Sequence, residues 1–440
     1  MNPSQLREVL AQIEHHPIKR LGQNFLHDQN LADFVAKLAV GADPSMPMVE
    51  IGPGLGALTA ALIRQKACLV AVERDPKLAA WLSQRYSEVQ VHHADALDFD
   101  WRILAPAGPH VLVGNLPYNI SSPLLEVWLQ DCPLIVRSVL MVQWEFAQRI
   151  LAEADEAERS ALGVMMQFQW NIVLERKVGP NVFYPKPDVA SAVIRLERKP
   201  ASPESLCDRP TLLTLVQAGF QQRRKQLRSS LKEFTLDWSR APISPELRAE
   251  NVTTAQWVSL AQLLRPPGLA QREAEEVFDV LDENDQVLYQ ATRKEVHVQQ
   301  LRHRAVHILL QNERGELLLQ KRSFLKDKHP GTWDSSAAGH VDAGEDYEQS
   351  AQREVLEECG VRVSLQRIGL LPPQADTGFE FIGLYFGRHE GPFTFPVSEI
   401  EALHFFPIPV VEQWLQQRPQ DFAPGFCQCW PHFLRWLAES

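Results

Sequence analysis

Three glutamates, Glu354, Glu357 and Glu358, stand three and four residues apart in a segment, 347–359, whose pattern predicts a helix. Because residues at these spacings share one side of a helix, that face carries three carboxylates. Alone they repel one another by a few tenths of a kcal/mol per pair. Mg2+ or Mn2+ removes the repulsion and can also hold phosphate oxygens. The spacing therefore predicts a metal site that acts on a phosphate compound, with an acidic surface helix as the alternative.

A second cluster begins with the glycine-rich segment 51–57, Ile-Gly-Pro-Gly-Leu-Gly-Ala, directly after the apolar run 48–51. Glycines there let the backbone approach a ligand closely and offer N–H groups at the start of a helix. The segment fits both a dinucleotide-binding turn and the turn of S-adenosylmethionine enzymes, and a plain tight turn is a third interpretation. Glu73, at the end of the next predicted strand, can accept hydrogen bonds from ribose hydroxyls in either enzyme class.

The segment Asn115-Leu-Pro-Tyr118 follows the predicted strand 111–113 and favours methyl transfer over hydride transfer. The amino group of a base is a poor nucleophile because its lone pair is delocalised into the ring. The Asn115 amide and the Pro117 carbonyl can accept the two hydrogens of that amino group and help to localise the lone pair. Tyr118 can stack on the base and hold it in line.

Over residues 15–266 the chain resembles the small-subunit rRNA adenine dimethyltransferases of the KsgA/RsmA type. The matching stretches are 19–26, 50–56, 94–96, 114–122, 182–187, 191–193 and 220–228. The resemblance implies that S-adenosylmethionine contacts Asn24, Leu26, Gly52, Glu73, Asp95 and Asn115. It also implies that Asp95 accepts from the cofactor's adenine amino group and that Phe183 forms a second stacking wall for the target base. The implied reaction is dimethylation of two adjacent adenines near the 3′ end of 16S rRNA, as part of ribosome biogenesis.

The run Arg223-Arg-Lys-Gln-Leu-Arg228 is a candidate contact for RNA. On a helix, Arg224 and Arg228 share one face while Lys225 lies on a neighbouring one, which makes a basic patch with Arg223. By itself the run is more typical of a solvated helix face. The resemblance to RNA-modifying enzymes favours contact with RNA phosphates.

The carboxylate helix belongs to a longer pattern, Gly339-x5-Glu345-x7-Arg353-Glu354-x2-Glu357-Glu358-x-Gly360, which is similar to the Nudix box at every defined position. The resemblance implies an α/β/α sandwich that hydrolyses a diphosphate such as a nucleoside diphosphate derivative. Gly339 would add a main-chain ligand to the metal, and Glu345 and Arg353 would orient the helix. Glu357 is the candidate general base. The surrounding sequence resembles the branch related to isopentenyl diphosphate isomerases, but no cysteine stands near Ser335, which favours hydrolysis.

Four histidines near this box, His297, His303, His307 and His340, are candidate phosphate contacts, although packed or surface positions are the commoner outcome for single histidines. Trp333 is a candidate for stacking on a base, with a core position as the alternative.

The elements that must position these residues predict an α/β protein. Apolar runs at 48–51, 68–72, 89–91 and 111–113 alternate with helical patterns at 58–64 and 76–86, which indicates a mostly parallel, Rossmann-like sheet. We predict a methyltransferase domain at 1–200, a helical RNA-binding subdomain at 201–266, a linker at 267–275 and a Nudix domain at 276–440. The Pro-Pro-Gly sequence at 266–268 and the charged run after it mark the linker.

Charge separates the two halves of the 440-residue chain. Up to residue 266, 28 basic residues balance 28 acidic ones, whereas residues 267–440 hold 16 basic and 27 acidic residues and carry the whole net charge of −11. Scattered cysteines and the absence of a long apolar segment predict a cytoplasmic protein that has no membrane partner.

Two other functions are weighed for the first half: a resistance-type methyltransferase for large-subunit rRNA, and a non-catalytic RNA-binding checkpoint in ribosome assembly.

Overall fold

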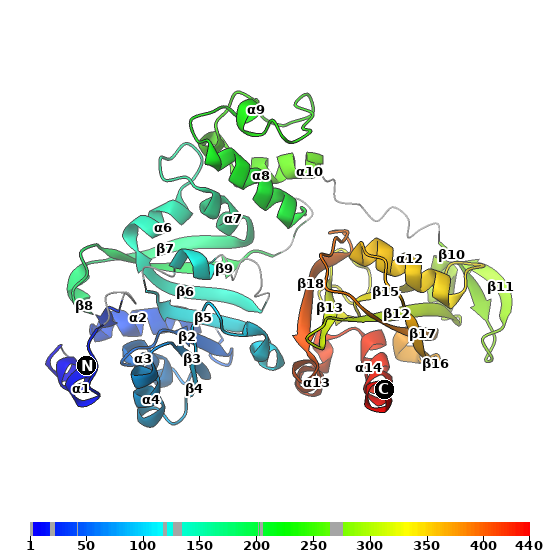
Figure 1. Ribbon diagram of the computed structural model, residues 1–440, viewed down its shortest axis with the longest axis horizontal. Helices are drawn as coiled ribbons and strands as arrows, with labels where there is room; N and C mark the ends of the chain where they lie inside the picture. Colours follow the sequence, from blue (N-terminus) through cyan, green and yellow to red (C-terminus); the bar gives the residue numbers. More distant parts are fainter. Residues whose placement is uncertain are drawn as a thin grey trace. The chain divides into compact units, whose positions relative to one another are not determined.

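The computed structural model describes residues 3–17, 23–41, 43–117, 121–125, 134–200, 202, 206–264 and 276–440. It divides into two compact units, the first formed by 1–200 with 209–265 and the second by 201–208 with 266–440 (Figure 1). This division agrees with the predicted change near residue 266, and the helical segment after 209 is part of the first unit. Among the helices of the described residues, none is both long and apolar enough to cross a lipid bilayer.

The described part of the first unit is built on a seven-stranded sheet in the order β4-β3-β2-β5-β6-β9-β7. The first five strands in this order are parallel, and β9 and β7 are antiparallel additions. The chain runs outward from β2 to β4 on one side and from β5 onward on the other, so the connection reverses between β2 and β5. Ligands of such sheets bind outside the carboxyl ends of the strands at that reversal. The strands are β2 (Met48–Ile51), β3 (Leu69–Glu73), β4 (Gln90–His93), β5 (His110–Asn115), β6 (Ile135–Gln143), β7 (Trp170–Val178) and β9 (Ser191–Arg198).

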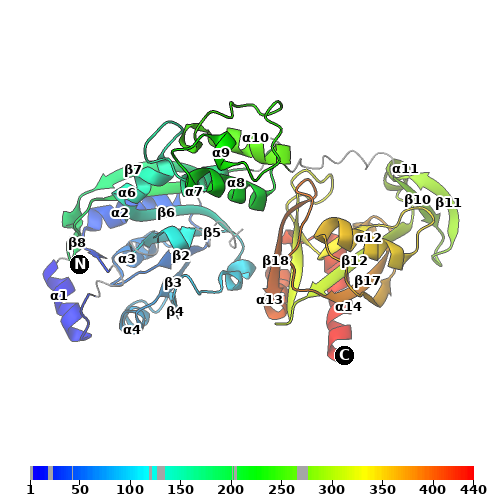
Figure 2. The ribbon, with the colours of Figure 1, turned by 45° about the horizontal axis from the view of Figure 1, so that its top comes forward.

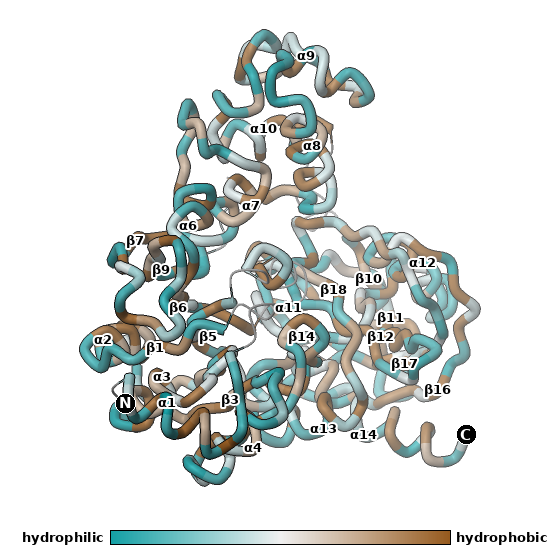
Figure 3. Tube along the Cα trace, turned by 60° about the vertical axis from the view of Figure 1, so that its left-hand side comes forward, coloured by the Kyte–Doolittle hydropathy of each residue, from teal (hydrophilic) through white to brown (hydrophobic). Residues whose placement is uncertain are grey.

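Helices cover the sheet because each has one apolar side, so that hydrophilic and hydrophobic segments alternate along them (Figure 3). Helices α2 and α3 pack on each other and bury Val35, Ala36 and Leu62 against the strands. A short pair of strands, β1 with β8, joins the N-terminal region to the segment before β9. These elements are α1 (Pro3–Gln12), β1 (Phe25–Leu26), α2 (Gln29–Val40), α3 (Ala57–Arg64), α4 (Pro76–Arg85), η2 (Trp101–Ala107), α6 (Trp144–Leu151), α7 (Ala161–Gln169), η3 (Pro180–Val182) and β8 (Phe183–Tyr184).

Within the predicted helical segment 201–266, helices lie between residues 209 and 264 and pack on α7 of the same unit (Figure 2). It contains α8 (Arg209–Gln221), α9 (Leu227–Ser230), η5 (Ala249–Asn251) and α10 (Thr254–Leu264). The fully buried guanidinium of Arg159 ties it in place by donating to the Ala152 carbonyl at 2.6 Å and to the Thr254 hydroxyl at 3.0 Å. A buried cation is costly to leave unpaired, so these bonds hold α10 against the α7 region.

The described part of the second unit contains a seven-stranded mixed sheet with helices on both faces (Figure 1). Central strand β12 pairs with β17 in parallel and with β13 and β15 in antiparallel fashion. Helix α12 packs on β12 and β15, and α14 packs on β12 and β16. The elements are β12 (His303–Gln311), β13 (Glu316–Arg322), β14 (Trp333–Asp334), β15 (Ala337–His340), α12 (Tyr347–Cys359), β16 (Gln366–Leu371), η6 (Ala375–Thr377), β17 (Glu380–Arg388), β18 (Ile400–Pro407), α13 (Ile408–Gln417), η7 (Pro419–Asp421) and α14 (Pro424–Glu439).

A separate hairpin precedes this sheet in the chain. Strands β10 (Val277–Leu281) and β11 (Val287–Thr292) pair with each other and are followed by α11 (Arg293–Gln299). Phe278, Val280 and Val296 form a small buried cluster between the hairpin and α11. The alternation of inward apolar residues in β10 therefore fixes where α11 lies.

Candidate functional site

The first site is a cavity at the reversal between β2 and β5. The glycine-rich segment forms the turn from β2 into α3, and Gly52, Gly54 and Gly56 all have positive φ angles, of 60°, 56° and 73°. L-residues with a side chain rarely adopt this conformation. A Cβ on Gly52 would also point at Pro117, with 3.9 Å between Cβ and the Pro117 Cδ, and would narrow the cavity.

All six residues implied as cofactor contacts line this one cavity: Asn24, Leu26, Gly52, Glu73, Asp95 and Asn115. They come from four strand ends of the sheet and from the segment around β1. Pro117, expected beside the target base, lines it as well. The residue types suit S-adenosylmethionine, because carboxylates can accept from its hydroxyl and amino groups while glycine backbone lies close.

The Glu73 carboxylate is buried at the carboxyl end of β3 and is held by backbone donors. Its two oxygens accept from the N–H of Gly54 at 3.0 Å and of Asp75 at 2.9 Å. Burial raises its pKa, and these hydrogen bonds oppose the increase. Glu73 thereby fixes the glycine turn and keeps a carboxylate at the cavity wall. Asp95 accepts from the Leu97 N–H at 3.1 Å and pairs with Arg74 at 3.0 Å.

The Asn115 side chain is oriented by a hydrogen bond within the cavity wall. Its Nδ2 donates to the Asn24 carbonyl at 2.8 Å, which leaves the amide oxygen as the acceptor of the side chain. This is the group expected to accept from a target amino group. The Pro117 carbonyl accepts from the Ser121 hydroxyl at 3.2 Å. Tyr118 lies outside the described residues, so its predicted stacking position stays a prediction.

Phe183 is placed differently from what the resemblance implies. Its side chain is 3% exposed, it stands opposite Leu26 in the β1–β8 pair, and it belongs to the apolar core under α2 and α3. Among the described residues that line the cavity, Phe183 does not occur. In this structure it is a core residue, because its ring gains more from apolar burial than from an open wall.

Glu50 is a cavity residue whose individual role the sequence interpretation missed. It is 1% exposed, lines the cavity, and accepts from the Thr59 hydroxyl at 2.6 Å. Burial raises its pKa to about 8, although the Thr59 hydrogen bond acts in the opposite direction. A glutamate inside the apolar run Met48-Val-Glu-Ile51 was the available signal.

The predicted helix through the basic run is wrong. Helix α8 ends at Gln221, and residues 222–225 form a turn before α9. The run offers no apolar residue to bury at positions 221–226, so nothing holds it as a packed helix. Arg223, Arg224, Lys225 and Arg228 are all exposed. Arg223 donates to the Ala157 carbonyl at 2.7 Å and pairs with Glu250 at 3.1 Å.

The second site is built on α12, whose observed bounds equal the predicted ones. Asp346 caps its N-terminus with a reciprocal capping box to Gln349, and Gly360 ends it with φ of 71°. Glu354 and Glu358 are buried on its inner side, whereas the Glu357 side chain is 52% exposed. The helix face therefore presents two enclosed carboxylates and one accessible one.

Gly339 is required by the position of Glu354. A Cβ on Gly339 would collide with the Glu354 carboxylate, so only glycine lets the carboxylate lie against the end of β15. Beside it, Glu358 Oε2 accepts from the Ala338 N–H at 2.9 Å and from the Gln320 amide at 3.0 Å. Burial raises the pKa of both Glu354 and Glu358, and for Glu354 the Glu358 charge adds to the increase.

Arg353 orders this group of carboxylates. Its guanidinium donates to Glu354 at 2.6 Å, to Glu345 at 3.1 Å and to the His340 carbonyl at 3.0 Å. The same guanidinium also forms an ion pair with the Glu357 carboxylate, at an N···O distance of 3.4 Å. The predicted orienting pair of Glu345 and Arg353 is thus formed. The atoms that could bind a metal ion here are carboxylate oxygens, and Mg2+ and Mn2+ prefer oxygen ligands.

The four candidate metal residues, Gly339, Glu354, Glu357 and Glu358, line one large cavity. Basic side chains line it too, among them Arg322, Lys326 and Lys328, so its walls can hold a phosphorylated compound. Trp333 is 3% exposed and packs against Phe406 and Trp414, which places it in the core. His307 pairs with the Ser335 hydroxyl at 2.8 Å, whereas His297, His303 and His340 come together.

The fold and the two cavities define a methyltransferase with a Rossmann-like sheet and, in the same chain, a Nudix unit. The family model described as ribosomal RNA adenine dimethylase matches residues 15–265, and the model of the NUDIX domain matches residues 301–426. The chain belongs to the ribosomal RNA adenine dimethylase family and carries a fused Nudix hydrolase domain.

Curated relatives agree with this assignment. The ribosomal RNA small subunit methyltransferase A of Methylococcus capsulatus is 39% identical over 259 residues, which cover 58% of this chain and 100% of the relative. That of Burkholderia cenocepacia is 41% identical over 262 residues, covering 57% and 94%. For the second unit, the solved MutT protein from Methanosarcina mazei is 23% identical, covers 31% of this chain and 92% of that one, and has a TM-score of 0.26.

We predict that Glu50 makes the first unit less stable as pH rises. Its pKa is about 8 in the folded chain against an ordinary value of 4.5, so between these limits the unfolded chain alone loses the proton. The free energy of unfolding should therefore fall by up to about 1.4 kcal/mol per pH unit across this range. Glu50→Gln should reduce that slope and raise the melting temperature at pH 8.

Calorimetry of the full chain from pH 5 to pH 8 measures this slope. The exposed Glu88 on the same unit supplies the control variant Glu88→Gln, which should behave like the unchanged protein. Equal slopes for the Glu50 and Glu88 variants would contradict the prediction.

Proposed function

We propose that the first unit transfers methyl groups from S-adenosylmethionine to the N6 amino groups of two adjacent adenines near the 3′ end of small-subunit rRNA. The observation that carries this proposal is that one cavity gathers the six implied cofactor residues, Asn115 among them, together with Pro117. The small-subunit names of relatives at 39% and 41% identity support this target over a large-subunit one. The oriented Asn115 amide supports catalysis over a purely RNA-binding role.

The residues of the chain have separable tasks in this proposal. S-adenosylmethionine supplies an electrophilic methyl group when it is bound. Glu73 and Asp95 would hold its hydroxyl and adenine amino groups. The Asn115 oxygen and the Pro117 carbonyl would accept the two amino hydrogens of the target adenine, so that the nitrogen lone pair is free to react. Tyr118 would stack on the base.

We propose that the second unit hydrolyses a diphosphate joined to another group, such as a nucleoside diphosphate derivative. Glu354, Glu357, Glu358 and the Gly339 main chain would hold Mg2+ or Mn2+, which supplies charge neutralisation and an acidified water when bound. Arg353 keeps the carboxylates oriented through its bonds to Glu345 and Glu354. The exposure of Glu357 supports its role as the general base, because it is the accessible side chain among the three glutamates.

Methyl transfer should depend on the acceptor oxygen of Asn115. We expect Asn115→Ala to lower the rate of transfer to immature small subunits by about 100-fold or more. Asn115→Asp keeps an acceptor oxygen but loses the hydrogen bond to Asn24, so it should retain more activity than the alanine variant. Tritium transfer from labelled cofactor measures both rates.

The control for this comparison is Asn171→Ala, at an exposed position of β7. It should transfer methyl groups at the ordinary rate, and cofactor affinity by calorimetry shows whether a variant has lost binding instead of transfer. Ordinary transfer by Asn115→Ala would refute the assignment.

Diphosphate hydrolysis should depend on Glu357, whereas the stability of the fold should not. Because Glu357 is half-exposed, Glu357→Gln removes a charge without opening a core, so hydrolysis should fall by at least about 100-fold while the metal-free melting temperature stays level or rises slightly. Glu348→Gln, on an exposed position of the same helix, is the matched control.

A screen of diphosphate compounds with Mg2+, read out as phosphate after phosphatase treatment, supplies the substrate for this measurement. If Glu357→Gln loses stability and keeps hydrolysis, the carboxylate has a structural role and the proposal fails. Methyl transfer by the same variant should be unchanged.

RNA contact should depend on the exposed turn after α8. Replacing Arg224, Lys225 and Arg228 by glutamine should weaken binding to the small-subunit particle and reduce the slope of log affinity against log salt by about 2 to 3. Arg223→Gln alone should change the slope less, because that guanidinium is already paired with Glu250. Arg314→Gln, highly exposed in the second unit, is the control. An unchanged slope in the triple variant would assign the turn to ordinary solvated surface.

A further inference from the structure

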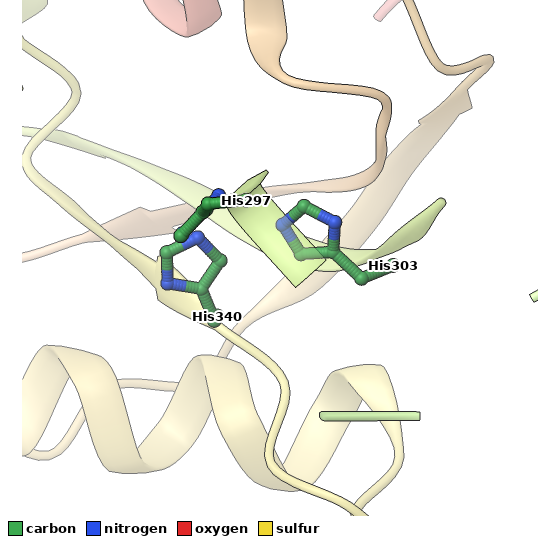
Figure 4. A group of neighbouring side chains, drawn as sticks. All are labelled: His297, His303 and His340. Atoms are coloured by element: carbon green, nitrogen blue, oxygen red, sulfur yellow. The ribbon is translucent and has the colours of Figure 1, made fainter. Parts of the chain in front are cut away.

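Three histidine side chains of the second unit converge beside a partly buried carboxylate, apart from the glutamates of α12. One donor nitrogen from each of His297, His303 and His340 lies within 4.8 Å of the others. Figure 4 shows the three rings as neighbours from different elements. Glu380 completes the group, with Oε1 at 3.7 Å from the His303 Nε2 and at 3.4 Å from the His340 Nε2.

The sheet itself fixes this arrangement. His303 begins β12 and stands opposite Glu380, the first residue of β17, in the parallel register. His340 ends β15 on the other side of β12, where it stands opposite Ala305. His297 is supplied by α11. Phe278 of β10 stacks on the rings of His303 and His340 at centroid distances of 5.7 Å and 4.7 Å, which closes one side of the group with an apolar wall.

Two of the rings present a buried Nε2 atom to the centre of the group, and the hydrogen bond of His303 leaves its Nε2 lone pair unused. His303 is fully buried, and its Nδ1 lies 2.9 Å from the Leu301 carbonyl, which can only accept, so Nδ1 carries the proton and Nε2 is bare in the neutral ring. The Nε2 atoms of His303 and His297 are buried and have no hydrogen-bond partner among the described residues. On His297 the other nitrogen, Nδ1, lies 2.9 Å from Lys328 Nζ and accepts from that ammonium, so Nε2 carries the ring proton and metal binding through Nε2 would release it.

The bare Nε2 of His303 faces the Glu380 carboxylate oxygen at 3.7 Å, and these two groups repel each other unless a proton or a metal ion lies between them. A backbone carbonyl that fixes the tautomer of a histidine is also the usual outer contact of a metal-binding histidine. Two donors bound to one ion at about 2.1 Å each lie at most about 4.2 Å apart, which small side-chain rotations can reach from the observed spacings.

We propose that His297, His303, His340 and Glu380 bind a divalent transition-metal ion of the zinc class, at a site distinct from the Mg2+ or Mn2+ site of the α12 glutamates. Imidazole nitrogens suit Zn2+, whereas the all-oxygen set of Glu354, Glu357 and Glu358 suits the harder ions. Three neutral imidazoles and one carboxylate leave a net charge of −1 that a divalent ion outweighs. His340 and Glu380 also line the large cavity, so the ion would be accessible from it.

The two sites share one stretch of main chain but do not depend on each other for ligands. Gly339 lies against Glu354. The next residue, His340, contributes its imidazole to the histidine group, and its carbonyl accepts from Arg353. The proposal therefore stands or falls independently of diphosphate hydrolysis.

The test uses the purified full chain, stripped with a chelator and dialysed against Zn2+ in excess Mg2+, with bound zinc measured by mass spectrometry. The unchanged protein should retain one zinc per chain, and His297→Gln and Glu380→Gln should each weaken retention by at least about tenfold. Glu357→Gln and His432→Gln, the latter at a half-exposed histidine of α14, should retain zinc like the unchanged protein.

Substitution with Co2+ gives a second readout, because the visible spectrum of the bound ion reports nitrogen and oxygen ligands and should change in His297→Gln. Melting curves establish whether each variant is folded. If His297→Gln does not fold, the Glu380→Gln variant provides the same test. The proposal is overturned if the unchanged protein retains no zinc, if the His297 and Glu380 variants retain it equally well, or if Glu357→Gln alone removes it.

Discussion

A carboxylate that is taken out of water must be compensated by donors or cations, and this constraint shapes both units of the chain. In the first unit, Glu73 is held by two backbone N–H groups, and one of these belongs to the turn that forms the cavity floor. In the second unit, Arg353 and the Ala338 N–H compensate Glu354 and Glu358. In both cases a glycine lies next to the acid or donates to it, because only glycine leaves the required space or conformation.

Elements with a strong local pattern were predictable from the sequence. The pattern of α12 and its caps gave its bounds correctly, and the apolar runs 48–51 and 111–113 correspond to β2 and β5. Strand ends that a parallel sheet brings to one edge account for Glu73 and Asn115 in one cavity, whereas Asn24 and Leu26 were implied by the family resemblance alone.

The misses share a physical cause, which is packing between distant segments. The run 223–228 has helical spacing of charges, but its first part has no apolar residue to bury and forms a turn, and a helix begins only at the buried Leu227. Phe183, which the resemblance implies as a second stacking wall for the target base, pairs with Leu26 and is buried in the core. His303 and His340 meet Glu380 through the registers of β12, β15 and β17, and α11 adds His297 to them; no sequence spacing reveals a register.

The position of β12 has a kinetic consequence for the second unit. Between Ala305 and Ile308 its backbone pairs with β15 on one side and β17 on the other, and it is buried throughout. Amides bonded within the centre of a sheet exchange with solvent deuterium only in the rarest openings. His303 and His307 lie on this strand, so the hydrogen-bonded structure around them should open last. The hairpin of β10 and β11, in which each strand has one partner, should open first.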